Sequence, residues 1–174
     1  MDITKQELCY SCVSNKLNEP QMKKIFILKG KSETGKTTKI NQIVDWIISN
    51  YGCSNTVGFD SKNLLKDTHG VLRIKKLSIG INSSGDTEWE VKKIDNLKVE
   101  SFEIINSPDI IICSCRTKGK GRRHLIDNYN SSTGWLRLFI NVEEFNKLDL
   151  KNQKIRDTRI LEELKTWLTG LEKL

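Results

Sequence analysis

The sequence predicts an α/β fold, with a doubly wound, mostly parallel sheet and helices on both faces. Three observations support this. A short apolar run at 24–29 precedes a glycine-rich loop at 30–37 and then a helical apolar pattern at 38–50. A continuous apolar run at 110–113 is typical of a strand buried on both faces of a parallel sheet. Strand and helix patterns alternate along the chain, which favours right-handed crossovers.

The segments around the loop have the composition expected of a strand and a helix. Residues 24–29 have the length and the β-leaning composition of a strand. After the loop, apolar residues follow the i, i+3, i+4, i+7 spacing of one helix face, at Ile40, Ile43, Val44 and Ile47. Gly52 is expected to end this helix.

The loop itself reads Gly30-Lys31-Ser32-Glu33-Thr34-Gly35-Lys36-Thr37, which fits the pattern G-x-x-x-x-G-K-[ST] at every fixed position. Its two glycines let the backbone approach a phosphate without a Cβ clash, and its amides converge at the positive end of the helix. We expect Lys36 to reach the β- and γ-phosphates and the Thr37 hydroxyl to bind Mg²⁺. The alternative is a glycine turn that only joins a strand to a helix.

Over this strand–loop–helix unit the chain resembles the P-loop nucleoside triphosphatases. The resemblance implies ATP, with GTP less favoured, and Mg²⁺. The residues it places around the nucleotide are Gly30, Lys31, Ser32, Glu33, Thr34, Gly35, Lys36, Thr37, Thr38 and Gly85. Catalytic roles are expected for Lys36, Asp86 and Arg116, and metal binding for Thr37 and Asp86.

Lys31 invites comparison with partitioning-type ATPases, whose loop G-K-G-G-x-G-K-[ST] carries an early lysine that reaches the partner's nucleotide in a dimer. Ser32 and Glu33 replace the two inner glycines of that loop. We therefore favour an ordinary loop with a lysine at a variable position.

The segment after the first helix contains two further predicted strands. Residues 55–60 form a moderately apolar strand that ends at Asp60, which is either a site residue or, more simply, a helix cap. Residues 61–70 are polar and read as a short helix or a loop. Apolar bursts at 71–74 and 77–81 flank Lys75-Lys76, and the second burst alternates as a strand does.

That strand leads into Asn82-Ser83-Ser84-Gly85-Asp86. In many P-loop proteins the strand beside the phosphate-binding strand ends in D-x-x-G or in an aspartate that holds Mg²⁺. Here Asn82 replaces the aspartate, Gly85 is expected to contact the γ-phosphate, and Asp86 to associate with Mg²⁺ or orient water. The alternative is a turn in which Asp86 or Thr87 caps the next helix.

A helix is predicted over 87–107, with Val91, Ile94, Leu97 and Ile105 on one side, and Pro108 ends it. After the strand at 110–113, the segment 116–124 places five cations within eight residues, spaced by two glycines. It is either a solvated basic loop, a lid whose Arg116 contacts phosphate, or a contact for a nucleic-acid backbone.

The remainder predicts a loop at 128–134, a strand at 135–140 and a helix from Asp157 onward. Asn146-Lys147-Leu148-Asp149 matches the guanine-specificity motif N-K-x-D by letters. Three residues separate it from the preceding apolar run, so coincidence is favoured, with ATP first and GTP in reserve.

At 174 residues the chain is expected to contain one nucleotide-binding domain at 22–174, preceded by an extension at 1–21. No apolar run is long enough to cross a bilayer, and no signal peptide is evident, so we expect a cytoplasmic protein that binds no membrane. The net charge of +7 suits nucleotide, phosphate or nucleic acid alike. Cys9 and Cys12 form half of a zinc-site pattern, without the other half.

Two functions follow. One is a phosphotransferase acting on a small phosphate acceptor, and the other is an ATPase or GTPase switch read by a protein partner or a dimer. A nucleic-acid-associated ATPase is a further possibility that rests on charge alone. No acyl-transfer triad is recognisable.

Overall fold

The computed structural model describes residues 22–53, 59, 63–101 and 104–169. In chain order its elements are β1 (Lys23–Lys29), α1 (Lys36–Tyr51), β2 (His69–Ile74), β3 (Leu77–Asn82), α2 (Glu88–Lys92), the 3₁₀ turn η1 (Lys93–Asn96), β4 (Val99–Ser101), β5 (Ile104–Asn106), β6 (Ile110–Cys115), α3 (Lys120–Asn128), the 3₁₀ turn η2 (Ser131–Thr133), β7 (Trp135–Asn141) and α4 (Leu150–Thr169).

A five-stranded, mostly parallel sheet has the order β2-β3-β6-β1-β7. β1 pairs in parallel with β6 and β7, and β6 pairs in parallel with β3. Only β2 is antiparallel, as a hairpin with β3 in which His69 lies opposite Asn82. The carboxyl ends of the four parallel strands therefore share one edge of the sheet, and the start of β2 lies at that same edge.

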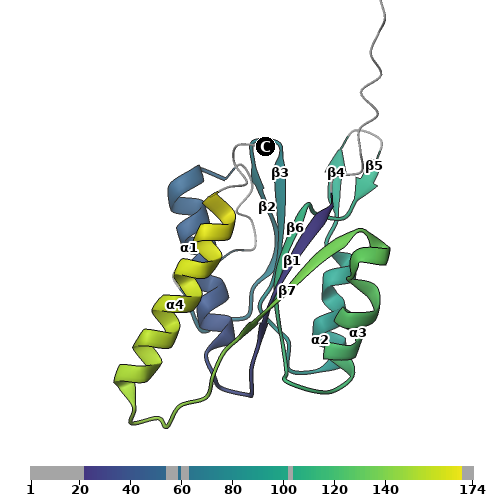
Figure 1. Ribbon diagram of the computed structural model, residues 1–174. Helices are drawn as coiled ribbons and strands as arrows, with labels where there is room; N and C mark the ends of the chain where they lie inside the picture. The colour runs from purple at the N-terminus through teal and green to yellow at the C-terminus, as the bar shows by residue number, and fades with distance from the viewer. Residues whose placement is uncertain (1–21, 54–58, 60–62, 102–103, 170–174) are drawn as a thin grey trace, which may run out of the picture.

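Helices cover both faces of the sheet (Figure 1). α1 and α4 pack on one face, where Ile40, Ile43, Val44, Ile47, Ile160, Leu164 and Leu168 join the core. α2 and α3 pack on the other face, where Val91, Leu125 and Tyr129 meet the buried residues of β1 and β6. The α/β class, the mostly parallel sheet and the first strand and helix are as the sequence predicts.

The neighbour of β1 is not the one expected from the sequence. We expected the strand ending at Asn82 to lie beside β1, but β6 lies between them. All six residues of β6 are buried, and a strand buried on both faces is stabilised by partners along both edges. The long apolar run therefore takes the inner position.

The helix expected over 87–107 is wrong beyond Asn96. Thr87 caps α2 through a capping box with Glu90, and the short helix passes into η1. Val99–Ser101 and Ile104–Asn106 then pair as an antiparallel ribbon, β4-β5. β-branched residues favour strands, so this stretch leaves the helical pattern although its apolar spacing continues it.

The last helix begins at Leu150 rather than at Asp157. Asp149 sets this start, because its Oδ1 accepts a hydrogen bond from the Asn152 amide at 3.2 Å, as an N-cap residue does. The expected extension at 1–21 with Cys9 and Cys12, and Asp60 with most of the strand expected at 55–60, lie outside the described residues. Among the described helices, none has the length and apolar character needed to span a bilayer.

Candidate functional site

The loop from Gly30 to Thr37 lies at the carboxyl edge of the sheet and joins β1 to α1. A side chain at Gly30 would place its Cβ 2.6 Å from Thr34 Oγ1 and 2.9 Å from the Val142 carbonyl oxygen, so only glycine fits where the loop passes β7. Gly35 has a φ of 82°. Glu33 has a φ of 57°, which is uncommon for a residue with a side chain and marks local strain.

Lys36 points into this loop. Its side chain is 6% exposed, and Nζ donates to the carbonyl oxygens of Gly30 at 3.2 Å and Lys31 at 2.6 Å. Asp86 Oδ1 lies 4.0 Å from the same nitrogen. Burial lowers the pKa of Lys36, and the Asp86 carboxylate opposes this shift. The loop thus encloses an ammonium group whose partners are mainly its own carbonyl oxygens.

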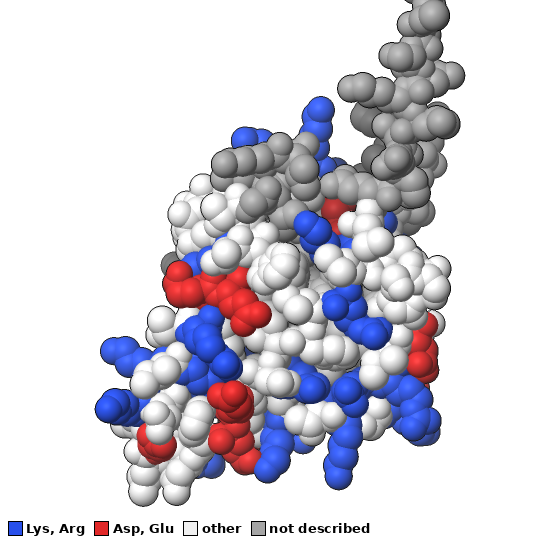
Figure 2. Space-filling view, viewed as in Figure 1, with Lys and Arg blue, Asp and Glu red and all other residues white. Residues whose placement is uncertain are grey.

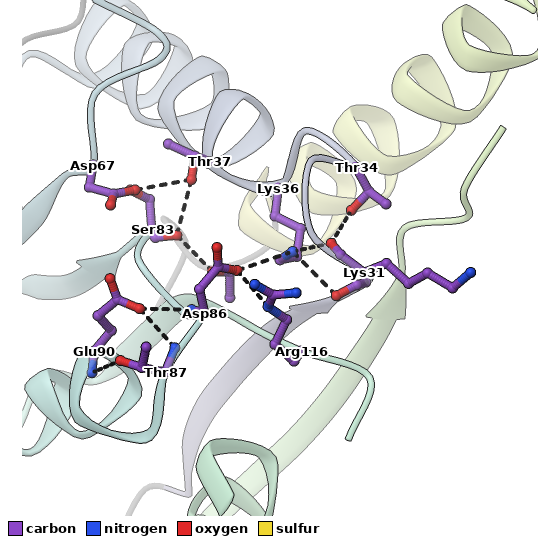
Figure 3. Close-up of polar contacts among 12 residues, drawn as sticks. Lys31, Thr34, Lys36, Thr37, Asp67, Ser83, Asp86, Thr87, Glu90 and Arg116 are labelled. Atoms are coloured by element: carbon purple, nitrogen blue, oxygen red, sulfur yellow. Dashed lines mark hydrogen bonds and ion pairs between the residues drawn. The ribbon is translucent and has the colours of Figure 1, made fainter. Parts of the chain in front are cut away.

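Asp86 and Arg116 come from the ends of two neighbouring strands and form an ion pair, with 2.9 Å between Arg116 Nε and Asp86 Oδ1 (Figure 3). Gly85 brings the two strand ends together, since a Cβ there would lie 2.1 Å from the Ser114 carbonyl oxygen. Three of the predicted site residues, Lys36, Asp86 and Arg116, therefore meet at one point.

The Thr37 hydroxyl faces the carboxylate of Asp67, which the sequence pattern does not indicate as a site residue. It donates to Asp67 Oδ1 at 3.1 Å and lies 3.3 Å from the Ser83 carbonyl oxygen. The Asn41 side chain, one turn further along α1, donates to the carbonyl oxygens of Leu64 and Lys66 at 3.1 and 2.7 Å. These bonds hold the segment that carries Asp67 against the start of α1.

A cavity of about 420 Å³ lies in front of these groups. It is lined by Glu33, Gly35, Lys36, Thr37, Thr38, Leu65, Asp67, Ser83, Ser84, Gly85, Asp86, Glu90 and Ser114. In the described part of the chain, no group of three or more His, Cys, Asp and Glu could hold a metal by itself. Mg²⁺ does not require one, since it is usually bound through one or two carboxylates together with substrate phosphates and waters.

The oxygen atoms of Thr37 and Asp67 fit such a hard cation. Asp86, expected at the metal, instead faces the cations Lys36 and Arg116. The alternative predicted for this segment is confirmed for Thr87, whose side chain accepts the Glu90 amide at 3.2 Å. Asn82 turns inward and donates to the carbonyl oxygens of Ser84 and Glu90.

The basic segment after β6 is only partly a loop. Residues 116–119 form the connection, and Gly119 has a φ of 107°. From Lys120 the chain is helical in α3, so of the two glycines only Gly119 lies in the connection, and Gly121 is part of the helix. A Cβ at Gly121 would lie 2.8 Å from Val91 Cγ2, which shows that this glycine allows α3 to pack on α2.

Lys31 extends away from the cavity and pairs with Glu144 of its own chain at 2.5 Å. The residues of the N-K-x-D match, 146–149, make local hydrogen bonds. Asn146 Oδ1 accepts the Leu148 amide at 3.0 Å, and Asp149 caps α4. Ser32, Glu33 and Thr34 line a second cavity, of about 350 Å³, on the side of the loop that faces Phe145 and Arg156.

Comparisons with family models, with curated proteins and with solved structures find no match for this chain. Of the predicted site residues, those that line the first cavity are Glu33, Gly35, Lys36, Thr37, Thr38, Gly85 and Asp86, and Arg116 pairs with Asp86 at its rim. Gly30 and Thr34 belong to the same loop but are not part of that lining. Lys31 and Ser32 lie outside that lining.

Proposed function

We propose that this chain is a P-loop domain of the doubly wound type that binds a Mg-nucleoside triphosphate and transfers or hydrolyses its γ-phosphoryl group. The observation that carries the proposal is the buried Lys36 ammonium, held by carbonyl oxygens of a strained glycine loop, with the 420 Å³ cavity in front of it. A buried ammonium at a helix N-terminus suits a polyphosphate far better than a neutral ligand.

The loop amides and Lys36 would bind the β- and γ-phosphates. Thr37 and Asp67 would hold Mg²⁺, which when bound neutralises the charge that develops on the phosphate oxygens. Arg116, which pairs with Asp86 at the rim of the cavity, would stabilise the same charge. A γ-phosphate competes with the Asp86 carboxylate for Lys36 and Arg116, so its arrival frees Asp86 to accept a proton or orient a nucleophile.

ATP is favoured over GTP because Asn146 and Asp149 make local hydrogen bonds rather than presenting their side chains together. The 350 Å³ cavity beside Phe145 adjoins the same loop and is the place we propose for the base. Transfer to an acceptor is our first choice. A switch that reads the γ-phosphate through Gly85 and Asp86 is the second, supported by the position of Gly85 in the cavity wall.

The binding test is titration of a fluorescent ATP analogue with Mg²⁺ into the purified protein and into Lys36→Ala. We expect the variant to lose at least about tenfold in affinity, because a phosphate-binding cation contributes on the order of 1.4 kcal/mol or more in a buried site. Lys151→Ala, an exposed lysine on α4, is the matched control. Equal affinity in Lys36→Ala, with the circular dichroism spectrum unchanged, rejects the proposal.

The reaction is tested by measuring ADP formation with and without a panel of nucleosides and nucleotides. Acceptor-dependent ADP formation supports a phosphotransferase. Slow hydrolysis that no acceptor accelerates supports the switch.

A further inference from the structure

Two further cavities border the Asp86–Arg116 ion pair. The smaller, of about 220 Å³, lies between the Gly85–Glu88 turn and the start of α3. The larger, of about 590 Å³, is lined by Lys31, Ser32, Asp86, Arg116, Thr117, Lys118 and Glu144. Asp86 also lines the 420 Å³ cavity, so one carboxylate borders all three spaces.

The smaller cavity carries an excess of positive charge. Arg116, Lys118, Lys120 and Arg122 line it, against the two carboxylates of Asp86 and Glu88. Glu88 is already paired with Lys92 at 2.7 Å, and Asp86 with Arg116. Within the described part of the chain, Lys118, Lys120 and Arg122 form no ion pair. Figure 2 shows basic side chains gathered at the lower right of this face, on the side of the molecule where α3 lies.

The Nε atom of each of the two arginines here also lacks a hydrogen-bond partner. Arg122 Nε is buried without one, and Arg116 Nε meets Asp86 as an ion pair rather than as an aligned hydrogen bond. A buried N–H without a partner is energetically unfavourable, so a ligand that lets these side chains reorient onto its oxygens would relieve that cost. The anion with enough acceptor oxygens for several cations at once is a phosphate group.

We propose that this basic cavity binds a second, phosphate-bearing ligand next to the γ-phosphate of the nucleotide, and that this ligand is the phosphoryl acceptor. The inference rests on the proposed function and adds the chemical class of the acceptor, which that function leaves open. The shared chemistry is a phosphate monoester, carried by a mononucleotide or by the 5′ end of a nucleic-acid strand.

Transfer to this group is chemically balanced. An oxygen of the acceptor phosphate bonds to the γ-phosphorus while the bond from the γ-phosphorus to the β–γ bridging oxygen breaks. The electron pair of that bond leaves with the nucleoside diphosphate. The acceptor dianion has no proton to lose, so in this transfer Asp86 is not needed as a base and its role is to orient the acceptor. Lys118 and Lys120 hold the acceptor, and Arg116 lies between the two ligands.

The test uses the full chain saturated with Mg²⁺ and a non-hydrolysable ATP analogue, studied by titration calorimetry. The probes are AMP, GMP, CMP and dTMP, each compared with its nucleoside, and a thymidine hexanucleotide with and without a 5′-phosphate. We expect at least one phosphorylated probe to bind about tenfold or more tightly than its unphosphorylated counterpart. Binding by a mononucleotide identifies a small acceptor, and binding only by the hexanucleotide identifies a strand end.

The variant Lys118→Ala/Lys120→Ala is expected to weaken that probe at least about fivefold and to leave the affinity for the ATP analogue within twofold. Lys151→Ala/Lys154→Ala, two exposed lysines on α4, is the matched control and should change neither. If the analogue binds but no phosphorylated probe does, or if the Lys118/Lys120 variant binds the probe as the unchanged chain does, the inference is wrong and the proposed function stands. If the analogue itself does not bind, both fail.

Discussion

The Thr37 hydroxyl makes contacts with two segments that are distant in the sequence. Asp67 precedes β2 and Ser83 follows β3, and both reach Thr37 because the β2-β3 hairpin returns the chain to the same edge of the sheet. Because the Thr37 hydroxyl donates to Asp67, the carboxylate of Asp67 is the one nearest the proposed metal position. Asp86 instead lies beside Arg116 and Lys36, the two cations proposed to bind the transferred phosphate.

Asp67→Asn tests this division of roles. The amide keeps the size of the side chain and removes its charge, so we expect the Mg²⁺ concentration that gives half-maximal nucleotide binding to rise about tenfold. A Mg²⁺ titration of the fluorescent ATP analogue measures it. Asp127→Asn, at an exposed position on α3, is the control. If Asp86→Asn shifts the Mg²⁺ midpoint and Asp67→Asn does not, Asp86 is the metal carboxylate instead.

The sequence indicates the loop residues but not Asp67, and the reason is physical. The loop residues are contiguous, so their spacing alone predicts their geometry. Asp67 lies 30 positions after Thr37 in the sequence, just before a hairpin whose turn is Lys75-Lys76. That hairpin holds Asp67 at the edge of the sheet where Thr37 lies. Interpreting the two apolar bursts as a hairpin would have placed Asp67 beside Ser83 and the start of α1. Asn, Asp and Gly are the usual residues of such a turn, so two lysines gave no signal.

At the level of elements, α1 and α4 are joined by an ion pair between a buried lysine and a partly exposed aspartate. Lys39 Nζ lies 2.7 Å from Asp157 Oδ2, and the lysine is 3% exposed. Burial lowers the pKa of Lys39, while the hydrogen bond to Asp157 raises it. Arg156, also buried, contacts the same carboxylate at 2.8 Å and donates to the Glu143 carbonyl oxygen. The pair therefore anchors the last helix beside the first turn of α1.

Asp157→Asn removes the charge that compensates Lys39. We expect a loss of about 2 kcal/mol in the free energy of unfolding, less than a fully buried pair would give because Asp157 is partly exposed. Urea denaturation measures it. The exposed pair Lys165–Glu162 supplies the control, since Glu162→Gln should cost less than about 0.5 kcal/mol. Similar losses in the two variants would contradict the anchoring role.

Apolar spacing predicts elements well where the packing agrees with it, as in α1, and poorly at 87–107. There Val91 and Ile94 lie on one helical turn, but the spacing that continues to Ile105 belongs to a strand pair. A three-residue strand contains too few positions to show its own period, so it cannot be distinguished from a helix by periodicity alone.

At the scale of the whole molecule, the stability of the fold depends on pH through Cys115, a thiol buried in the core. Burial raises the pKa of Cys115 to about 11, against a normal value of 9.0, although Arg122 and Lys36 act in the opposite direction. The folded chain therefore retains a proton that the unfolded chain loses near pH 9. The stability that this thiol contributes is complete below pH 9 and is lost as the pH rises toward 11.

Comparison with Cys115→Ala measures this loss. The variant lacks the thiol, so the difference in unfolding free energy between the two proteins should shrink by roughly 1 kcal/mol between pH 8 and pH 10. Denaturant titrations at the two pH values provide both free energies. A difference that stays constant with pH would show that the thiol ionises as readily in the folded chain as in the unfolded one.

The fold class was predictable because buried parallel strands are long apolar runs, and Ile110–Cys115 is one of them. The strand order was not predictable, because it depends on which apolar segment becomes the central strand beside β1. The basic segment 116–124 was recognisable from its density of lysine and arginine. Its division into a short connection and α3 depends on Gly121 packing against Val91.

The position of Asp86 between the cavities has a thermodynamic consequence. One carboxylate neutralises cations that both proposed ligands need, so whichever ligand binds first releases Asp86 and changes the free energy of binding the second. Linkage requires that this change be the same in either order. The nucleotide and its acceptor would then bind cooperatively, with a coupling energy set largely by one side chain.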